Sequence, residues 1–310
     1  MSKGQVALLR QILGAGGPPS RLPLAKLRRN FELLLDRFTG PEAEIRPADL
    51  PGLPGLPEDA SAEWVDARQD RDRPAARTVL YLHGGGFVIG SARSHRHLIA
   101  RLSHEADAVC LALDYRLAPE FPFPAALDDA GTALAALLDH PDGPRLDPRR
   151  LVMAGDSAGG GLAVMAAVRR RAAGLSLPAF LYLLSPWTDY EGTGASLAEN
   201  AALDPVVQPD GLARMARHYL GNHDPWDPAL CPLTAELTGL PPTLIQVGGV
   251  ETLLDDSRRL HARLTDAGVA SHLDIWPDMI HVWQLFASRL DEGAEALADA
   301  GRRLHRAVPS

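Results

Sequence analysis

Short runs of apolar residues alternate with longer stretches of helical periodicity from residue 79 to the carboxyl terminus. The runs are typical of buried strands, and they lie at 79–83, 108–114, 151–154, 179–184, 243–247 and 271–276. The periodic stretches predict helices at 95–105, 125–138, 157–173, 256–267 and 283–305. Strands that alternate with helices form βαβ units, so we expect an α/β fold with a mostly parallel central sheet flanked by helices.

The amino-terminal part of the chain follows a different pattern. Residues 5–38 carry apolar and basic positions at helical spacing, interrupted at 14–19, which predicts two short amphipathic helices. Residues 47–57 hold four prolines and two glycines, a composition that favours a linker or surface crossing. We therefore place a boundary there and expect residues 1–48 to form a helical cap segment.

A second region, 189–242, interrupts the alternation of strands and helices. It is rich in Gly, Asp and Pro, and it holds one helical stretch at 211–220 without a clear strand. Insertions at the carboxyl edge of parallel strands are where α/β enzymes build covers over their substrates. We expect a cap insertion at 190–230, paired in space with the amino-terminal helices, and a core built from 49–189 and 231–310.

Composition and charge narrow the class of protein. Hydrophobic residues make up 46% of the chain and charged residues 23%, which supports a large core. The formal net charge of −8 disfavours binding to nucleic acids and anionic membranes. Two cysteines, Cys110 and Cys231, are too few for a disulfide framework, and neither a secretory signal nor a membrane-spanning stretch stands out. We therefore expect a cytoplasmic protein that binds neither nucleic acid nor membrane.

The sequence GDSAG at 155–159 lies between an expected strand and an expected helix. A serine on such a tight turn is held in a strained, exposed conformation, and the flanking glycines let neighbouring chains approach closely. The amino terminus of the helix also favours negative charge that develops beside it. Ser157 is therefore a candidate nucleophile, with a helix amino cap as the alternative role.

The sequence HGGGF at 83–87 directly follows another expected strand. Three consecutive glycines allow backbone N–H groups to approach a ligand atom with no side chain in the way. A tight loop alone would explain one or two glycines. Because this loop and the serine turn both follow central strands, we expect them to meet at the same edge of the sheet.

A nucleophilic serine needs a histidine base and an orienting carboxylate. Among the 11 histidines, His281 is the best candidate, because it follows the last expected strand by a short loop and fits the chain order nucleophile, acid, histidine. His83 is expected to anchor the glycine loop. His95, His97 and His104 lie on an expected helix, and we interpret them as surface residues.

The acid is expected between the nucleophile and the histidine, at the end of a strand. The segment after the expected strand 243–247 offers three carboxylates, Glu251, Asp255 and Asp256. The pattern alone does not rank them.

Four separated motifs carry a family resemblance: HGGGF at 83–87, DYRLAPE at 114–120, GDSAGG at 155–160 and HVWQLF at 281–286. Together they resemble the hormone-sensitive-lipase-like esterases, also called bacterial family IV, over roughly residues 60–305. The resemblance implies an α/β-hydrolase fold with a small helical cap. It also implies hydrolysis of a small carboxylic ester without a metal or an organic cofactor, and a possible homodimer.

Carried over residue by residue, the resemblance assigns roles in the reaction. Ser157 resembles the family nucleophile and His281 the base. The backbone groups of Gly85, Gly86 and Ala158 match the positions of the oxyanion hole.

The acid is where this sequence departs from the family. Many members carry Asp-Pro-Leu-x-Asp with the first Asp catalytic, and here Glu251 occupies that first place and Asp255 the last. The spacing of Glu251 to His281 resembles that of the family more closely, and one subgroup uses Glu there. We favour Glu251 as the orienting acid and Asp255 as a structural carboxylate.

Three aromatic residues, Phe87, Trp187 and Trp283, are candidates for the wall of a substrate pocket. Packing in the core explains them equally well. The motif at 114–120 is interpreted as a structural ion-pair network and turn near the serine.

The hypothesis is a serine carboxylesterase that hydrolyses short- to medium-chain esters through an acyl-enzyme on Ser157, with His281 as general base and Glu251 as acid. One alternative is transfer of the acyl group to another acceptor, or peptide cleavage, on the same triad. Another is a non-catalytic receptor for a small molecule on the same scaffold. The presence of His281 counts against the receptor, because receptors of this kind have lost that histidine.

Overall fold

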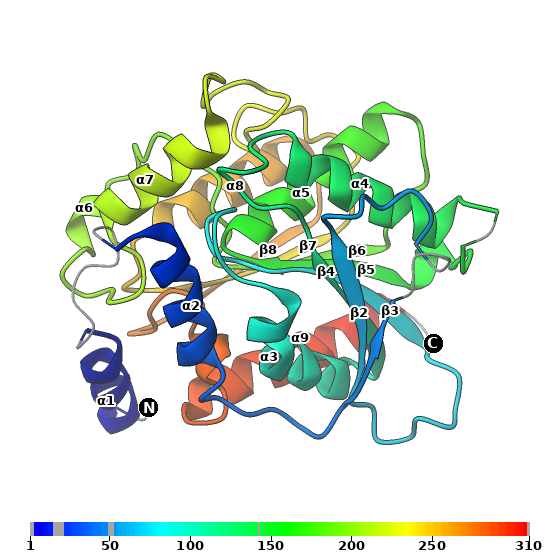
Figure 1. Cartoon of the computed structure of the whole chain (residues 1–310), viewed down its shortest axis with the longest axis horizontal. Helices are drawn as coiled ribbons and strands as arrows, with labels where there is room; N and C mark the ends of the chain where they lie inside the picture. The colour runs from blue at the N-terminus through cyan, green and yellow to red at the C-terminus, as the bar shows by residue number, and fades with distance from the viewer. Residues whose placement is uncertain (1–2, 15–21, 49–52, 142, 309–310) are drawn as a thin grey trace.

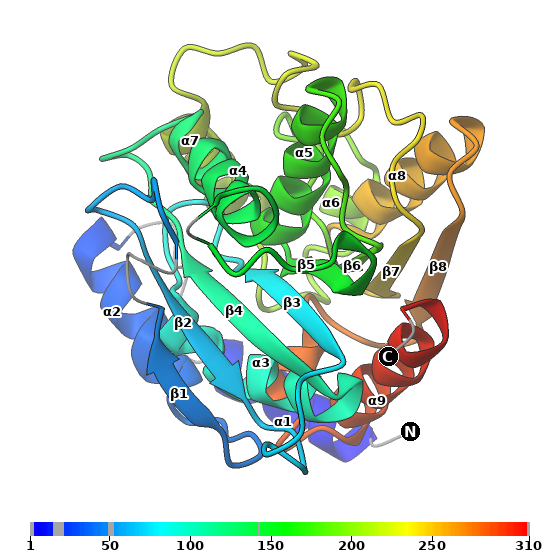
Figure 2. The same cartoon turned by 90° about the vertical axis from the view of Figure 1, so that its right-hand side faces the viewer.

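The computed structural model describes residues 3–14, 22–48, 53–141 and 143–308. An eight-stranded sheet forms the centre of the described chain, with helices on both faces (Figures 1 and 2). Its strands are β1 (Glu44–Pro47), β2 (Ser61–Asp66), β3 (Arg77–Leu82), β4 (Ala108–Asp114), β5 (Leu151–Asp156), β6 (Phe180–Leu184), β7 (Thr243–Gly248) and β8 (Ser271–Trp276). Their order across the sheet is β1-β2-β4-β3-β5-β6-β7-β8.

The mostly parallel sheet and its six predicted strands are confirmed. Strands β3 to β8 are parallel to their neighbours within that group, and every residue of β5, β6 and β7 is buried. Two antiparallel strands were missed, since β2 pairs with β4 and β1 pairs with β2. All four residues of β1 are exposed, so no apolar pattern indicates this edge strand.

Helices cover both faces of the sheet, each with its own apolar core (Figure 2). On one face lie α3 (Ala92–Ala106) and α9 (Asp291–Ala307). On the other face lie α4 (Ala125–Leu138), α5 (Ala158–Ala172) and α8 (Leu254–Asp266).

The helix expected at 283–305 is in fact two elements. A short 3-10 helix spans Trp283–Phe286, and α9 begins only at Asp291. The backbone of Val282 is left-handed, with φ 45°, so the chain turns sharply just after His281. The turn separates the residues next to the candidate base from the helix that packs on the sheet.

The predicted amino-terminal helices are present as α1 (Lys3–Gly14) and α2 (Leu24–Leu35). Most of the interruption expected at 14–19, and part of the crossing expected at 47–57, fall outside the described residues. None of the helices in the described ranges combines the length and apolar character that a membrane span requires.

The region inserted between β6 and β7 contains α6 (Ser196–Glu199) and α7 (Pro209–Leu220). It lies on the same side of the molecule as α2 (Figure 1). A side-chain nitrogen of Arg214 on α7 donates a hydrogen bond to the carbonyl oxygen of Leu22, just before α2, at 2.7 Å. The amino-terminal segment and the insertion therefore meet.

Candidate active site

Ser157 lies on the turn between β5 and α5 with a positive φ of 51° and a ψ of −119°. Its N–H donates to the carbonyl oxygen of Leu184 at 2.8 Å, which ties the turn to the neighbouring strand β6. A Cβ atom at Gly155 would collide with the carbonyl oxygen of Gly159, and one at Gly159 would collide with that of Leu82. Both flanking positions therefore require glycine, and the turn has the strained geometry of a nucleophile elbow.

His281 and Glu251 come from the loops that follow β8 and β7. Nδ1 of His281 lies 3.0 Å from Oε1 of Glu251. The other carboxylate oxygen, Oε2, accepts hydrogen bonds from the Ser185 hydroxyl and from the N–H of Gly248, each at 2.7 Å. Because Glu251 is completely buried, these contacts hold Oε1 toward the imidazole.

The charge of Glu251 determines the protonation of His281. Burial alone lowers the pKa of His281, but the neighbouring carboxylates, Glu251 first among them, together outweigh burial and raise that pKa above its ordinary value. Asp204 and Asp156 act in the same direction. The site therefore stabilises an imidazolium, the form that a general base takes once it has accepted a proton.

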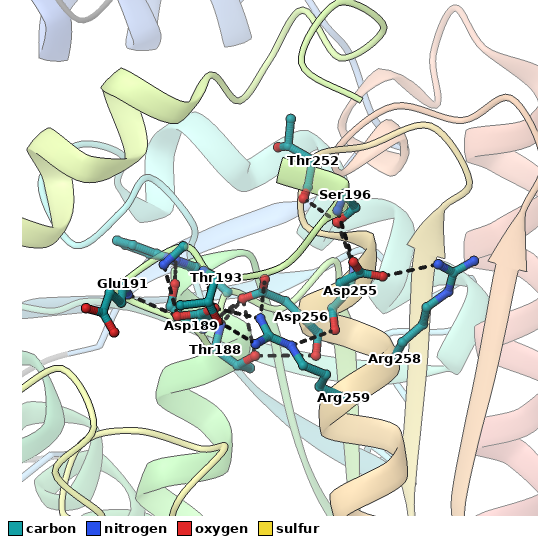
Figure 3. A network of polar contacts seen from close by, with 12 residues as sticks. Thr188, Asp189, Glu191, Thr193, Ser196, Thr252, Asp255, Asp256, Arg258 and Arg259 are labelled. Carbon is teal, nitrogen blue, oxygen red and sulfur yellow. Dashed lines mark hydrogen bonds and ion pairs between the residues drawn. The ribbon is translucent and has the colours of Figure 1, made fainter. Parts of the chain in front are cut away.

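Asp255, the alternative acid, is held elsewhere. Its carboxylate accepts a hydrogen bond from the N–H of Ser196 at 3.0 Å and pairs with Arg258 at 3.1 Å (Figure 3). These contacts tie the start of α8 to the inserted region and leave Glu251 as the candidate carboxylate that contacts His281.

Asp256, the third carboxylate, belongs to the same polar network (Figure 3). It accepts hydrogen bonds from the N–H groups of Thr188 and Asp189, each at 2.8 Å. Asp189 in turn pairs with Arg259 at 2.7 Å. Burial raises the pKa of Asp256 to about 7, and the neighbouring charge of Asp189 adds to the shift.

The glycine loop at 83–87 has positive φ angles at Gly85 (110°) and Gly86 (62°). A Cβ atom at Gly85 would collide with the carbonyl oxygen of Ile89, and one at Gly86 with the sulfur of Met215 on α7. Gly85 therefore requires glycine, whereas at Gly86 the positive φ favours glycine and the flexible end of Met215 can shift.

The main-chain N–H groups of Gly85, Gly86 and Ala158 are the candidate oxyanion donors. Among the turn and loop hydrogen bonds of the described chain, none is donated by these three groups to a main-chain carbonyl. They are thus available to an oxygen atom of a ligand.

Ser157 and His281 line one cavity of about 110 Å³, together with Gly85 and Gly86. Its wall is formed by α2, by the glycine loop, by the region inserted between β6 and β7 with its helix α7, and by the residues that follow His281. The apolar side chains that line it are Phe31, Ile89, Val206, Val207, Leu212, Met215, Val282 and Leu285. A small apolar cavity beside a serine suits a short alkyl group.

The three aromatic pocket candidates lie outside this cavity wall. The ring of Phe87 stacks on that of Tyr219, with centroids 3.7 Å apart, and Trp187 meets Tyr190 edge to face at 4.9 Å. Both aromatics, like Trp283, are almost completely buried. Packing therefore accounts for all three, and the apolar wall consists mainly of aliphatic side chains that periodicity could not single out.

The interpretation of the α3 histidines as surface residues is wrong for His95. This side chain has no exposed surface, and its Nε2 lies 3.4 Å from Oδ2 of Asp156. His97 is half-buried, with Nε2 2.8 Å from the carbonyl oxygen of Leu285. His83 lies as expected, with Nδ1 2.7 Å from the carbonyl oxygen of Gly84 in the glycine loop. The motif beside Ser157 contains Asp156, but nothing in it indicates a partner on α3.

The motif at 114–120 forms the expected ion-pair network. Arg116 pairs with the buried Asp129 at 2.7 Å, and Glu120 pairs with Arg28 of α2 at 2.7 Å. The second pair connects the amino-terminal segment to the chain that follows β4.

Comparisons with known proteins show the family to which the chain belongs. The family described as the alpha/beta hydrolase fold matches residues 79–285. The chain is 46% identical over 249 residues to a Streptomyces hygroscopicus protein named acetyl-hydrolase, covering 80% of each chain. It is 34% identical to an Acinetobacter venetianus esterase, covering 91% of this chain and 89% of the relative.

Solved structures give the same result. A crystal structure of an esterase/lipase from an uncultured bacterium superposes with a TM-score of 0.90 at 38% identity, covering 100% of both chains. An esterase of the bacterial hormone-sensitive lipase family superposes with a TM-score of 0.89 at 40% identity, covering 99% of both chains. The fold and these matches thus define an α/β hydrolase. Within that superfamily the chain belongs to the hormone-sensitive-lipase-like carboxylesterases, a family of carboxylic ester hydrolases.

Proposed function

We propose that the chain is a serine carboxylesterase that hydrolyses short- to medium-chain carboxylic esters through an acyl-enzyme on Ser157. The observation that most supports this is the meeting of Ser157, His281, Gly85 and Gly86 in the wall of one small, largely apolar cavity. A nucleophile, a base and oxyanion donors around one point are the parts that acyl transfer needs.

In the first half of the reaction, Nε2 of His281 takes the proton of the Ser157 hydroxyl while Oγ forms a bond to the ester carbonyl carbon. The carbonyl oxygen becomes an oxyanion that accepts hydrogen bonds from the N–H groups of Gly85, Gly86 and Ala158. Glu251 stabilises the imidazolium through Nδ1, 3.0 Å away. The tetrahedral intermediate then breaks its bond to the alcohol oxygen, which leaves with the proton from His281.

In the second half, a water molecule replaces the alcohol. His281 takes a proton from this water, whose oxygen attacks the acyl carbon on Ser157, and the same donors stabilise the second oxyanion. Collapse breaks the bond to Oγ of Ser157, which regains its proton from His281. The products are the carboxylic acid and the free enzyme.

The size of the substrate follows from what covers the site. Phe31 from α2 and Leu212 and Met215 from α7 line the cavity of about 110 Å³. We propose that residues 1–48 and 190–230 form a cap over a core built from 49–189 and 231–310. A cavity this small favours short acyl groups, in keeping with the name acetyl-hydrolase given to the Streptomyces relative.

The test is hydrolysis of p-nitrophenyl esters of increasing acyl length by the parent and by Ser157→Ala, with folding matched by circular dichroism. We expect turnover of acetate and butyrate esters that falls by about 10⁴-fold or more in Ser157→Ala. Parent turnover that survives the substitution would overturn the role of Ser157. Absence of any turnover, with binding of small esters, would favour the receptor alternative.

Added alcohols distinguish hydrolysis from acyl transfer. We expect acid to remain the main product when methanol is present at low concentration, and a predominance of the new ester would favour the acyltransferase alternative. A homodimer and a cytoplasmic location remain predictions.

A further inference from the structure

A buried acid and a buried histidine lie beside the nucleophile, and the mechanism above gives them no role. Asp156, the residue before Ser157, is 2% exposed, and His95 in the first turn of α3 has no exposed surface. Asp156 Oδ2 and His95 Nε2 are 3.4 Å apart. Because ionisable side chains are seldom buried without a reason, this pair calls for a function.

The contacts of His95 fit a doubly protonated ring. Nδ1 lies 3.1 Å from the carbonyl oxygen of Ser91, and Nε2 faces the carboxylate of Asp156. The Ser94 hydroxyl, 3.0 Å from Nδ1, already donates its proton to the carbonyl oxygen of Ser91 at 2.9 Å. Within the described residues Nε2 makes no hydrogen bond but faces Oδ2 of Asp156 at 3.4 Å, an ion-pair distance, so the imidazolium, with a proton on each ring nitrogen, gives both nitrogens an acceptor oxygen to face.

The contacts of Asp156 fit a carboxylate that also holds the glycine loop. Its Oδ1 accepts hydrogen bonds from the Tyr81 hydroxyl at 2.8 Å and from the N–H of Gly84 at 2.9 Å. A Cβ atom at Gly84 would collide with Oδ2, so the carboxylate packs directly on the backbone of the loop. Asp156 thus fixes the residue immediately before the two candidate oxyanion donors, Gly85 and Gly86.

The surroundings of the pair agree with these protonation states. Burial alone lowers the pKa of His95, but Asp156, with Ser91 and Glu32, outweighs burial and raises it, and the attraction between the pair holds the pKa of Asp156 below its ordinary value despite burial. His83 is neutral, because burial, with the charge of His95, lowers its pKa to about 4. The titratable groups around the pair are Glu32 on α2, Tyr81 on β3, His83 after β3, Asp114 at the end of β4, Tyr115 after it, His97 on α3 and His281 after β8.

An isolated carboxylate beside Ser157 would oppose the negative charge that develops on the substrate oxygen. We propose that His95 and Asp156 form a permanent imidazolium–carboxylate pair that fixes the glycine loop through Gly84 and cancels the charge of Asp156 beside Ser157. The inference rests on the proposed function. Both are positioning residues, acting through the loop and the local electrostatic potential.

The proposal predicts that the two single substitutions differ in their effect on the pH at which kcat/KM for p-nitrophenyl butyrate falls on the acid side. Asp156→Asn removes the carboxylate that keeps His95 protonated, so the buried ring loses its proton, both charges disappear and the acid-side midpoint stays close to that of the parent. His95→Gln leaves the negative Asp156 without its partner, so the pKa of His281 rises and the acid-side midpoint of kcat/KM moves to higher pH. The double variant D156N/H95Q returns close to the parent, because both charges are gone.

The same variants distinguish an effect on the positioning of the glycine loop from an effect on substrate binding. We expect either single substitution to lower kcat at least tenfold while KM changes less than threefold. His104→Gln, on the same helix but outside the pair, is the matched control and should leave the acid-side midpoint of kcat/KM unchanged. A neutral His95 would instead give no shift in His95→Gln and equal shifts to lower pH in Asp156→Asn and the double variant, which would overturn the proposal.

A measurement on the parent protein keeps the proposal testable if these variants fail to fold. Histidine ring signals in an NMR pH titration should include one, assigned to His95 by its position beside Tyr81 and His83, that stays protonated well above the ordinary histidine pKa of about 6.5. A His95 ring that loses its proton below that pH would overturn the proposal. If the parent showed no hydrolysis dependent on Ser157, the proposed function would fail, and this titration would still decide the state of the pair.

Discussion

Oε1 of Glu251 lies 3.0 Å from Nδ1 of His281, while Oε2 of the same carboxylate is held by Ser185 and Gly248 at 2.7 Å each. Rotation of the carboxylate away from the imidazole would break two short hydrogen bonds in a buried site. The carboxylate is therefore fixed before substrate arrives.

Replacement of this carboxylate tests its role. We expect Glu251→Gln to lower kcat by about 10²- to 10⁴-fold, because an amide does not stabilise the imidazolium and can impose the wrong tautomer on His281. Asp255→Asn is the matched control, and its kcat should stay close to that of the parent. A larger loss in Asp255→Asn than in Glu251→Gln would refute the assignment of the acid.

The pH profile of kcat/KM follows from the raised pKa of His281. The base must be neutral in the free enzyme, so activity falls as the pH drops through this pKa, and we expect the midpoint above the ordinary histidine value of about 6.5. Removal of the negative charge in Glu251→Gln should move the midpoint to lower pH. A midpoint that is the same in parent and variant would contradict the account.

The length of acyl chain that the enzyme accepts should depend on Met215. Its sulfur packs against Gly86, and its side chain lines the cavity. Met215→Ala removes this wall, so we expect kcat/KM for hexanoate relative to acetate esters to rise about tenfold, in the range that one or two methylene groups contribute. Leu220→Ala, on the same helix but outside the cavity, should keep the profile of the parent. If Met215→Ala also kept it, the cavity would not hold the acyl group.

The stability of the fold should respond to Asp256. Its pKa of about 7 in the folded state lies above the ordinary value, so the folded protein binds a proton that the unfolded chain releases, and stability falls as the pH rises toward 7. Between pH 5 and pH 8 this contributes a loss of about 3 kcal/mol. Asp256→Asn keeps an acceptor for the N–H groups of Thr188 and Asp189, and urea unfolding of the variant should lose correspondingly less stability over that range. Equal losses in parent and variant would show that Asp256 does not titrate there.

Much of the fold follows from the sequence because the central strands are apolar on both faces. The runs in β5, β6 and β7 are buried at every residue and therefore visible as continuous apolar segments. The strand Glu44–Pro47 could not be found in this way, since its residues are all exposed and its pairing with β2 is a long-range contact.

In the candidate site, too, the sequence reveals the residues that a local pattern marks and not those that meet only in the folded chain. Ser157 and the glycines 84–86 stand out because their backbone conformations demand particular residues in a short segment. The pair formed by His95 and Asp156 joins two elements far apart in the chain, and a histidine on a helix gives no local sign of burial against a carboxylate.

The central claim is that an ester leaves its acyl group on Ser157 before water releases it. The most direct measurement is intact-mass spectrometry of the enzyme quenched in acid within milliseconds of mixing with p-nitrophenyl acetate, followed by peptide mapping. We predict one added acyl group per chain, on the peptide that contains Ser157, appearing with the first burst of p-nitrophenol and absent from Ser157→Ala. Release of p-nitrophenol at the full rate by Ser157→Ala, or an acyl group that maps to another residue, would contradict the account.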